Sequence, residues 1–170
     1  ELLRQPLLHG DETTLQVLKE PGKKAQSKSY LWAYCSDRRS SRPVVLFDYQ
    51  PGRGHQYPKA FLDGYQGTVM TDGYSAWRML EGVHHLGCWA HARRKLHEIA
   101  KGGAAPIAEE GLRRIAELYR IEATIRGQTP EERLRVRQVE ATPRVDAFGD
   151  WIEKTRARVS AKSALGQALR

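Results

Sequence analysis

The sequence has little of what marks secreted, disulfide-stapled or membrane-spanning proteins. Only 2 of its 170 residues are cysteines. Cys35 and Cys88 both stand in apolar stretches, and so sparse a pair predicts reduced thiols in a cytoplasmic protein. No apolar run in these residues approaches the roughly 20 residues that cross a bilayer, and we expect no signal peptide. These absences exclude a disulfide mini-scaffold and a transmembrane protein.

The sequence also lacks a basic tail, although it is basic overall. It has 28 Lys and Arg residues against 20 Asp and Glu residues, a formal net charge of +8. The excess is spread evenly over both halves of the chain. Because each neutralised phosphate releases counterions, this balance favours a polyanionic partner. Charge alone does not separate DNA from RNA or from a membrane surface.

The first hundred residues read as strands joined by turns. Short alternating or aromatic-rich runs are bounded by Pro, Gly and polar clusters, which are typical strand and turn signals. Two more helical stretches and a basic helix interrupt this pattern. We predict strands within residues 7–18, 30–35, 44–47, 68–71 and 84–88, and helices within residues 58–65, 75–80 and 90–101.

From residue 102 onward the pattern is helical only. Leu112, Ile115 and Leu118 begin a series with the three- and four-residue spacing of an amphipathic helix. Thr129 followed by Pro130 and Glu132 predicts a capped helix start, and another apolar set follows a break at Pro143. We therefore expect an α/β domain over residues 1–103 and an all-helical subdomain over residues 104–170.

Two acidic residues stand out by their positions in this pattern. Asp11 interrupts an apolar strand, and Asp72 ends another. Burying a carboxylate there costs desolvation unless the group is paired, and a divalent cation such as Mg²⁺ is a general solution. The alternative is structural: Asp11 would accept backbone N–H groups at a bulge, and Asp72 would cap the helix after Gly73. Position alone favours this structural alternative slightly.

The order of elements is that of a ribonuclease-H-like fold, a mixed five-stranded sheet in which the first and fourth strands are neighbours. Three segments also resemble core motifs of the insertion sequence 66 family of bacterial transposases. These are His9-Gly10-Asp11-Glu12-Thr13, Thr71-Asp72-Gly73-Tyr74 and the segment from Gly87 to Lys95, which includes Cys88-Trp89-Ala90-His91. Later segments around residues 118–122, 132–137 and 162–166 resemble that family as well.

The resemblance implies an Asp-Asp-Glu transposase catalytic domain that cleaves and joins DNA at transposon ends. Asp11 would be the first acid and Asp72 the second, and together they would bind Mg²⁺ or Mn²⁺. The family's third acid, a Glu in an Asn-containing motif, lies beyond Arg170 in this resemblance, and the chain contains no Asn. We therefore expect weak metal binding and a fragment that is inactive alone. The start at Glu1, without Met, also suggests a piece of a longer protein.

Several other residues are candidates for binding. Cys88 and His91 have the spacing of half a zinc site, but no second Cys pair exists, so a structural or active-site-adjacent role is favoured. DNA contacts are expected from basic side chains after the first strand and at the start of the basic helix: Lys23, Lys24, Lys28, Arg93, Arg94 and Lys95. Arg38 and Arg42 should lie at the opposite end of the sheet, and Gly52-Arg53-Gly54 reads only as a turn.

Two other functions remain open at this stage. A nuclease or resolvase of the same fold would share the two acids but lack the helical insertion. A non-catalytic DNA-binding or assembly module would fit the missing third acid. In the family, the full-length protein is expected to act on transposon ends and target DNA as a homo-oligomer, and Arg133 and Arg137 of the helical subdomain are a further hypothesis for end binding.

Overall fold

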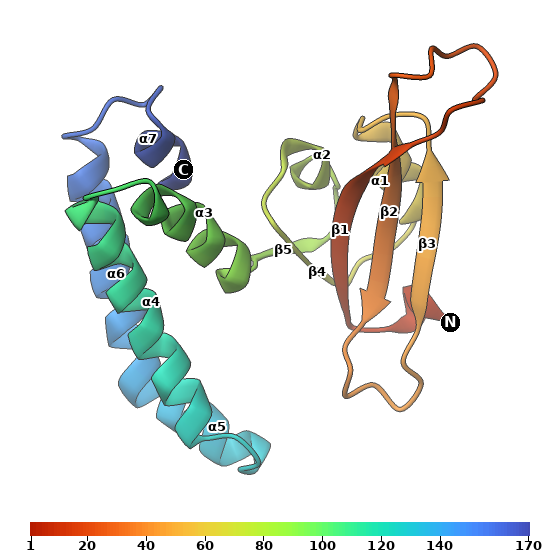
Figure 1. Ribbon diagram of the computed structural model, residues 1–170. Coiled ribbons are helices and arrows are strands. Elements are labelled where there is room, and N and C mark those ends of the chain that lie inside the picture. The colour runs from red at the N-terminus through yellow and green to blue at the C-terminus, as the bar shows by residue number, and fades with distance from the viewer. The chain divides into compact units, whose positions relative to one another are not determined.

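A mixed five-stranded sheet forms the first of the two compact units into which the chain divides, Glu1–Cys88 and Trp89–Arg170 (Figure 1). The computed structural model describes all of residues 1–170. The strands are β1 (Leu7–Gln16), β2 (Lys28–Ser36), β3 (Val45–Gln50), β4 (Thr68–Thr71) and β5 (His84–Gly87). Their order is β3-β2-β1-β4-β5. β1, β2 and β3 pair antiparallel, whereas β4 pairs parallel with both β1 and β5. The α/β class and the neighbouring first and fourth strands are confirmed.

The core of the sheet unit lies on one face of the sheet and is rich in aromatic rings. Every second residue of β2 points inward, so Trp32 and Tyr34 are almost completely buried. They pack with Trp77 of helix α2 (Ser75–Arg78), and helix α1 (Gln56–Phe61) stacks Phe61 on the Tyr34 ring. A short 3-10 helix, η1 (Leu2–Arg4), adds Leu2 to the same core. The tryptophans of this unit are therefore core residues.

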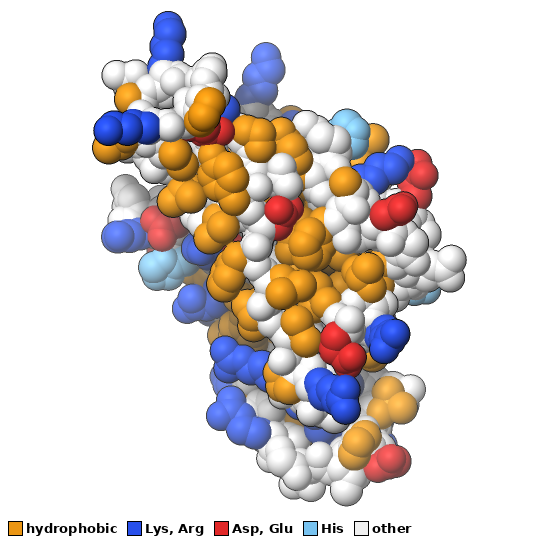
Figure 2. Space-filling model, turned by 90° about the vertical axis from the view of Figure 1, so that its right-hand side faces the viewer, with side chains coloured by type: hydrophobic (Ala, Val, Ile, Leu, Met, Phe, Trp, Pro, Cys, Tyr) orange, Lys and Arg blue, Asp and Glu red, His pale blue; other side chains and the backbone are white.

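The edge strand β3 stays largely uncovered. Phe47 is 65% exposed and Val45 is 55% exposed, and these alternate residues share one face of the strand. Figure 2, which views the molecule from the β3 side, shows hydrophobic side chains gathered there between charged ones. The sheet is thus packed on the face that holds Trp32, while much of its other face remains open.

The second unit contains only helices: α3 (Trp89–Lys101), α4 (Pro106–Thr124), α5 (Pro130–Val136), the π-helical segment η2 (Arg137–Ala141), α6 (Thr142–Arg156) and α7 (Ala164–Ala168). Its main core joins Leu96 of α3, Ile115 of α4 and Phe148 of α6. Because α3 buries its apolar side there, it belongs with the helices, and the division falls at residues 88 and 89 instead of the expected 103 and 104. None of the helices is both long and apolar enough to cross a membrane.

The predicted capped helix start is present in the second unit, but the predicted break is not. Thr129 Oγ1 accepts the backbone N–H of Glu132 at 3.3 Å, as a capping residue should. At Pro143 the helical path continues, because Pro143 occupies the first turn of α6, where its missing N–H costs no helical hydrogen bond. The π-helical segment η2 lies between α5 and α6 and connects them without a break in the helical path.

Candidate active site

The two predicted acids lie at the same level of neighbouring parallel strands. β1 pairs with β4 through Leu8 with Val69 and His9 with Met70. Continuing this register by two residues brings Asp11 opposite Asp72, just beyond the end of β4. Leu8 and Gly10 of β1 are buried, whereas Asp11, one residue further along, is exposed on the other side of the strand. The arrangement therefore brings both acids to the carboxyl end of β4.

The Asp72 carboxylate organises the turn that leads into α2. Its Oδ1 accepts the backbone N–H of Tyr74 at 2.8 Å, and Tyr74 is the residue that precedes the helix. Gly73 has a φ of 81°, which a residue with a side chain rarely adopts. This bond stabilises the turn before α2 and is not the predicted cap of the helix, which has no side-chain cap, and Oδ2 accepts no hydrogen bond. For Asp11 the expected bulge is absent, since β1 and β2 pair without interruption, but Asp11 Oδ1 does accept a backbone N–H, that of Glu12 at 3.0 Å.

A third carboxylate, Glu12, is buried beside the two aspartates. Its side chain is 1% exposed and points to the same face as Leu8 and Gly10. Glu12 accepts hydrogen bonds from Arg53 Nε at 2.8 Å and from Trp77 Nε1 at 2.7 Å. Burial raises the pKa of Glu12, and the hydrogen bonds from Arg53 and Trp77 oppose that rise. The Arg53 cation compensates a carboxylate that would otherwise be costly to bury.

Arg53 connects Glu12 to the turn that carries Asp72. Its guanidinium lies 3.7 Å from the centre of the Tyr74 ring, a cation–π contact. Tyr74 Oη donates a hydrogen bond to the Arg53 carbonyl at 3.1 Å. We call Glu12, Arg53, Tyr74 and Trp77 the Glu12 cluster. Sequence analysis missed its role, although one signal was present: Glu12 is a charged residue at an inward position of β1, which requires a partner.

The carboxylates fit a divalent cation only in part. Asp11 and Asp72 offer carboxylate oxygens at neighbouring positions, a donor type that suits Mg²⁺ when waters and phosphate complete its shell. Glu12 is engaged by Arg53 and faces the core side. No group of three or more His, Cys, Asp or Glu side chains is placed to bind a metal ion anywhere in the structure. Two aspartates are therefore the whole ligand set that this chain offers here.

Cys88 lies beside the candidate site through its backbone. It follows β5, and its N–H donates to the carbonyl of Thr71 at 2.9 Å, immediately before Asp72. His91 belongs to α3 in the helical unit. Neither residue is part of a metal-binding group.

The predicted DNA-binding lysines lie in the loop between β1 and β2 and at the start of β2. This loop is at the same end of the sheet as the carboxyl end of β4, because β1 and β4 are parallel, while Arg38 and Arg42 lie at the opposite end (Figure 1). Lys23 is held within the loop by Glu20 at 3.2 Å and by Ser29 at 2.9 Å. Lys24 and Lys28 are exposed and form no ion pair, so they are the better candidates for phosphate contacts.

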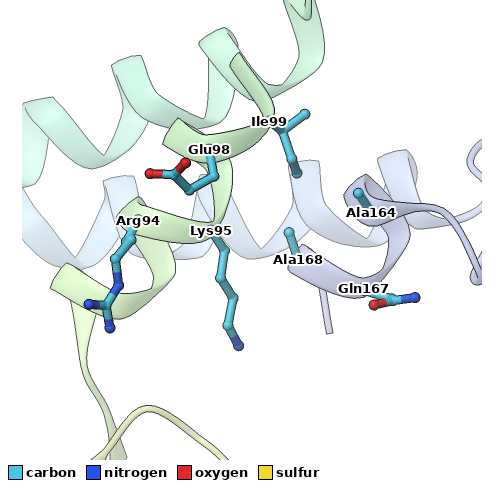
Figure 3. Close-up of a pocket in the computed structure, with 7 residues that line it drawn as sticks. All are labelled: Arg94, Lys95, Glu98, Ile99, Ala164, Gln167 and Ala168. Atoms are coloured by element: carbon cyan, nitrogen blue, oxygen red, sulfur yellow. The ribbon is translucent and has the colours of Figure 1, made fainter. Parts of the chain in front are cut away.

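The basic residues of α3 are exposed, and two of them border a pocket. Arg94 and Lys95 line an open pocket of about 790 Å³ with residues of α3 and α7 (Figure 3). Both side chains extend away from α3, and Glu98 from the next turn shares the rim. Arg93 is exposed as well.

In α5 and η2, by contrast, arginines are paired with glutamates. Arg137 forms a two-pronged ion pair with Glu122, at 2.6 and 2.7 Å, and Arg135 pairs with Glu132 at 2.7 Å. Arg137 is therefore committed to a contact within the helical unit, which weakens the hypothesis that it binds transposon ends.

Comparison with known proteins identifies the family. The family model described as "Transposase IS66 family" matches residues 1–170. The chain is 34% identical to the uncharacterized protein y4qI of Sinorhizobium fredii, over 94% of this chain and 32% of that relative. It is 32% identical to the uncharacterized protein y4jD of the same organism, over 98% of this chain and 35% of that relative. No solved structure matches it.

This chain belongs to the IS66 family of transposases. It spans about a third of the length of the curated relatives that it matches.

Proposed function

We propose that this chain forms the larger part of the catalytic region of a metal-dependent DNA transposase with a ribonuclease-H-like fold. The observation that supports the proposal is the register of β1 and β4: its last pair is His9 with Met70, and Asp11 and Asp72 each follow two residues later, near the carboxyl end of β4. Neighbouring acids on adjacent strands are what a phosphodiester-cleaving metal site requires. Membership of a transposase family supports DNA transposition as the process, and we infer from it cleavage and strand transfer at transposon ends.

Asp11 and Asp72 would hold one or two Mg²⁺ or Mn²⁺ ions, which would activate the attacking oxygen and stabilise the leaving one. The chain's own part is to fix the two carboxylates. Asp72 keeps its place because its Oδ1 accepts the Tyr74 N–H, while Oδ2 faces no donor of the chain. Asp11 is held in the ladder of β1 and β2 opposite Ala33, and its Oδ1 accepts the backbone N–H of Glu12 at 3.0 Å.

A third acid would come from another segment of the full-length protein, because Glu12 is already bound by Arg53. With two carboxylates the Mg²⁺ shell is incomplete, so this chain should bind metal weakly and should not nick supercoiled plasmid. Nicking by the chain that disappears in Asp72→Ala would overturn this point. It would mean that another acid within residues 1–170 completes the site.

The central test uses a full-length transposase that contains this segment and a duplex that carries its own transposon end. We expect Mg²⁺-dependent cleavage that Asp11→Ala and Asp72→Ala each reduce by at least about 100-fold, because each removes a ligand. Glu81→Gln is the matched control, since Glu81 is an acid of the same unit with a side chain that is 88% exposed. Full cleavage by either aspartate variant would refute the proposal.

DNA should cross the end of the sheet where the loop between β1 and β2 lies. Replacing Lys24 and Lys28 together by Ala should weaken DNA binding and lower the slope of log affinity against log salt by about 2, since each phosphate contact contributes about 0.9. Replacing Arg38 and Arg42 is the matched control at the opposite end of the sheet. Equal losses in both pairs would indicate a general charge effect and no defined DNA path.

A non-catalytic DNA-binding or assembly module is the second candidate. The observation that favours it is the absence of any group of three metal-binding side chains. It predicts that the full-length protein binds transposon ends with unchanged affinity when Asp11 and Asp72 are both replaced by Ala, and that neither the parent nor the variant cuts them.

A further inference from the structure

The Glu12 cluster places a strong cation close to the carboxylates that the proposed function assigns to metal binding. Arg53 lies against the Tyr74 ring, and Tyr74 is hydrogen-bonded through its N–H to Asp72. The Arg53 guanidinium and the Asp72 carboxylate therefore both contact Tyr74, one through its ring and the other through its backbone N–H. An arginine in this place would be expected to pair with Asp72 and to neutralise it, which would oppose cation binding.

Glu12 offers Arg53 a different partner. Its buried carboxylate accepts both Nε and Nη2 of Arg53 while Trp77 Nε1 fixes its second oxygen. The Trp77 ring packs directly against Gly10. Even a Cβ at Gly10 would lie 2.5 Å from the ring, so the ring has no room to move toward β1. The Asp11 side chain therefore lies on one face of β1. On the other face, Gly10 leaves room for Trp77, and Glu12 binds Arg53.

We propose that Glu12 is a positioning residue that holds Arg53 beneath the Tyr74 ring and so keeps Asp72 available for a divalent cation. This inference rests on the proposed function. It assigns a role to Glu12, Arg53 and Tyr74, which the two-acid site does not use directly. Glu12 itself contacts neither metal nor DNA in this arrangement.

The first experiment measures Mn²⁺ affinity of the 170-residue chain by electron paramagnetic resonance. Glu12→Gln should weaken Mn²⁺ binding about tenfold, because the released Arg53 charge turns to Asp72. Adding Arg53→Met should restore most of that affinity. Adding Arg78→Met instead should not, although Arg78 Nη2 also lies near this turn, 3.4 Å from where a Cβ of Gly73 would be. Equal affinity of Glu12→Gln and Glu12→Gln/Arg53→Met would overturn the inference.

A second experiment does not depend on metal and separates this inference from the proposed function. The Nε–H resonance of Arg53 is followed by nuclear magnetic resonance without any divalent cation. Asp72→Asn should leave it nearly unchanged when Glu12 is present, but should shift it clearly in the Glu12→Gln background. Equal shifts in the two backgrounds would show that Glu12 does not divert Arg53 from Asp72. If the expected shifts appear while the chain binds no Mn²⁺, the inference about Arg53 stands and the metal site of this chain is refuted.

Discussion

The sheet unit and the helical unit use oppositely charged side chains in different ways. In the sheet unit the Glu12 side chain is 1% exposed, and its partner Arg53 comes from a loop 41 residues away. In the helical unit the Arg137 and Glu122 side chains are each 42% exposed, and most other pairs join residues three or four apart on one helix, although Arg144 of α6 also pairs with Glu117 of α4. Burial of Glu12 makes its pairing with Arg53 specific, whereas the exposed pairs of the helical unit can be replaced by other charged or polar side chains.

The difference indicates where function is built. A buried carboxylate such as Glu12 that loses its partner leaves an uncompensated charge, whereas water replaces either partner of an exposed pair at little cost. In the sheet unit this buried carboxylate lies beside the candidate site formed by Asp11 and Asp72. The helical unit has apolar cores and surface pairs, an arrangement that supports a scaffold or a binding surface better than a reaction site.

The largest effect is expected from Trp77→Ala. Trp77 is 0% exposed, packs edge-on against Trp32 and binds Glu12, so its loss should destabilise the sheet unit by about 3–5 kcal/mol. Amide hydrogen exchange resolved by residue should show faster exchange in β1 and β2, with α4 unaffected. Equal acceleration in α4 would mean that the two units unfold together and would break the comparison.

A pair of glycine substitutions should give opposite signs in the two units. Gly10→Ala places a Cβ 2.5 Å from the Trp77 ring and should cost about 1–3 kcal/mol, because neither β1 nor the indole can move freely. Gly149→Ala meets no atom within 4 Å in α6 and should stabilise the protein by about 0.5–1 kcal/mol. Urea unfolding measures both, and a stabilising Gly10→Ala would contradict the packing described for β1.

Thr129→Ala should have an intermediate effect confined to the helical unit. It removes the side-chain oxygen that accepts the Glu132 N–H at the start of α5, which is worth about 1 kcal/mol. Thr129→Ser keeps the cap and should keep most of the stability, as measured by thermal unfolding. A loss as large in Thr129→Ser would point to packing of the methyl group.

The smallest effects concern two half-buried acids, Asp37 and Glu110, and appear in the pH dependence of stability. Hydrogen bonds from Arg39 lower the pKa of Asp37 to about 2, and the hydrogen bond from Arg113 lowers the pKa of Glu110. An acid whose pKa is lower in the folded than in the unfolded protein stabilises the folded state at pH values above its unfolded-state pKa. This stabilisation is lost as the pH falls through the folded-state pKa. Asp37→Asn and Glu110→Gln should therefore each cost less than about 1 kcal/mol at pH 7.

These differences should fade on acidification, for Asp37 between about pH 4 and pH 2. Urea titrations at a series of pH values measure them. A difference between parent and variant that grows toward low pH would contradict the assigned sign.

The sequence by itself was enough to predict the order of strands and helices, the helical second half and the two acids on neighbouring strands. Local patterns determine these features: alternation along β2, three- and four-residue spacing in α4, and Thr129 at the start of α5. Asp11 and Asp72 stood out because burying a carboxylate in an apolar strand is costly. Asp11 is in fact exposed, and the buried carboxylate of β1 is Glu12.

Only the tertiary structure decided which partners those residues have. Arg53 reads as part of a turn, and its contact with Glu12 exists because β3 and the loop after it bring residues 53 and 12 together. Helix α3 joined the helical unit because the apolar cluster of α4 and α6 was available to bury Leu96. In both cases the energy depends on burial by segments distant in sequence, which no local pattern specifies.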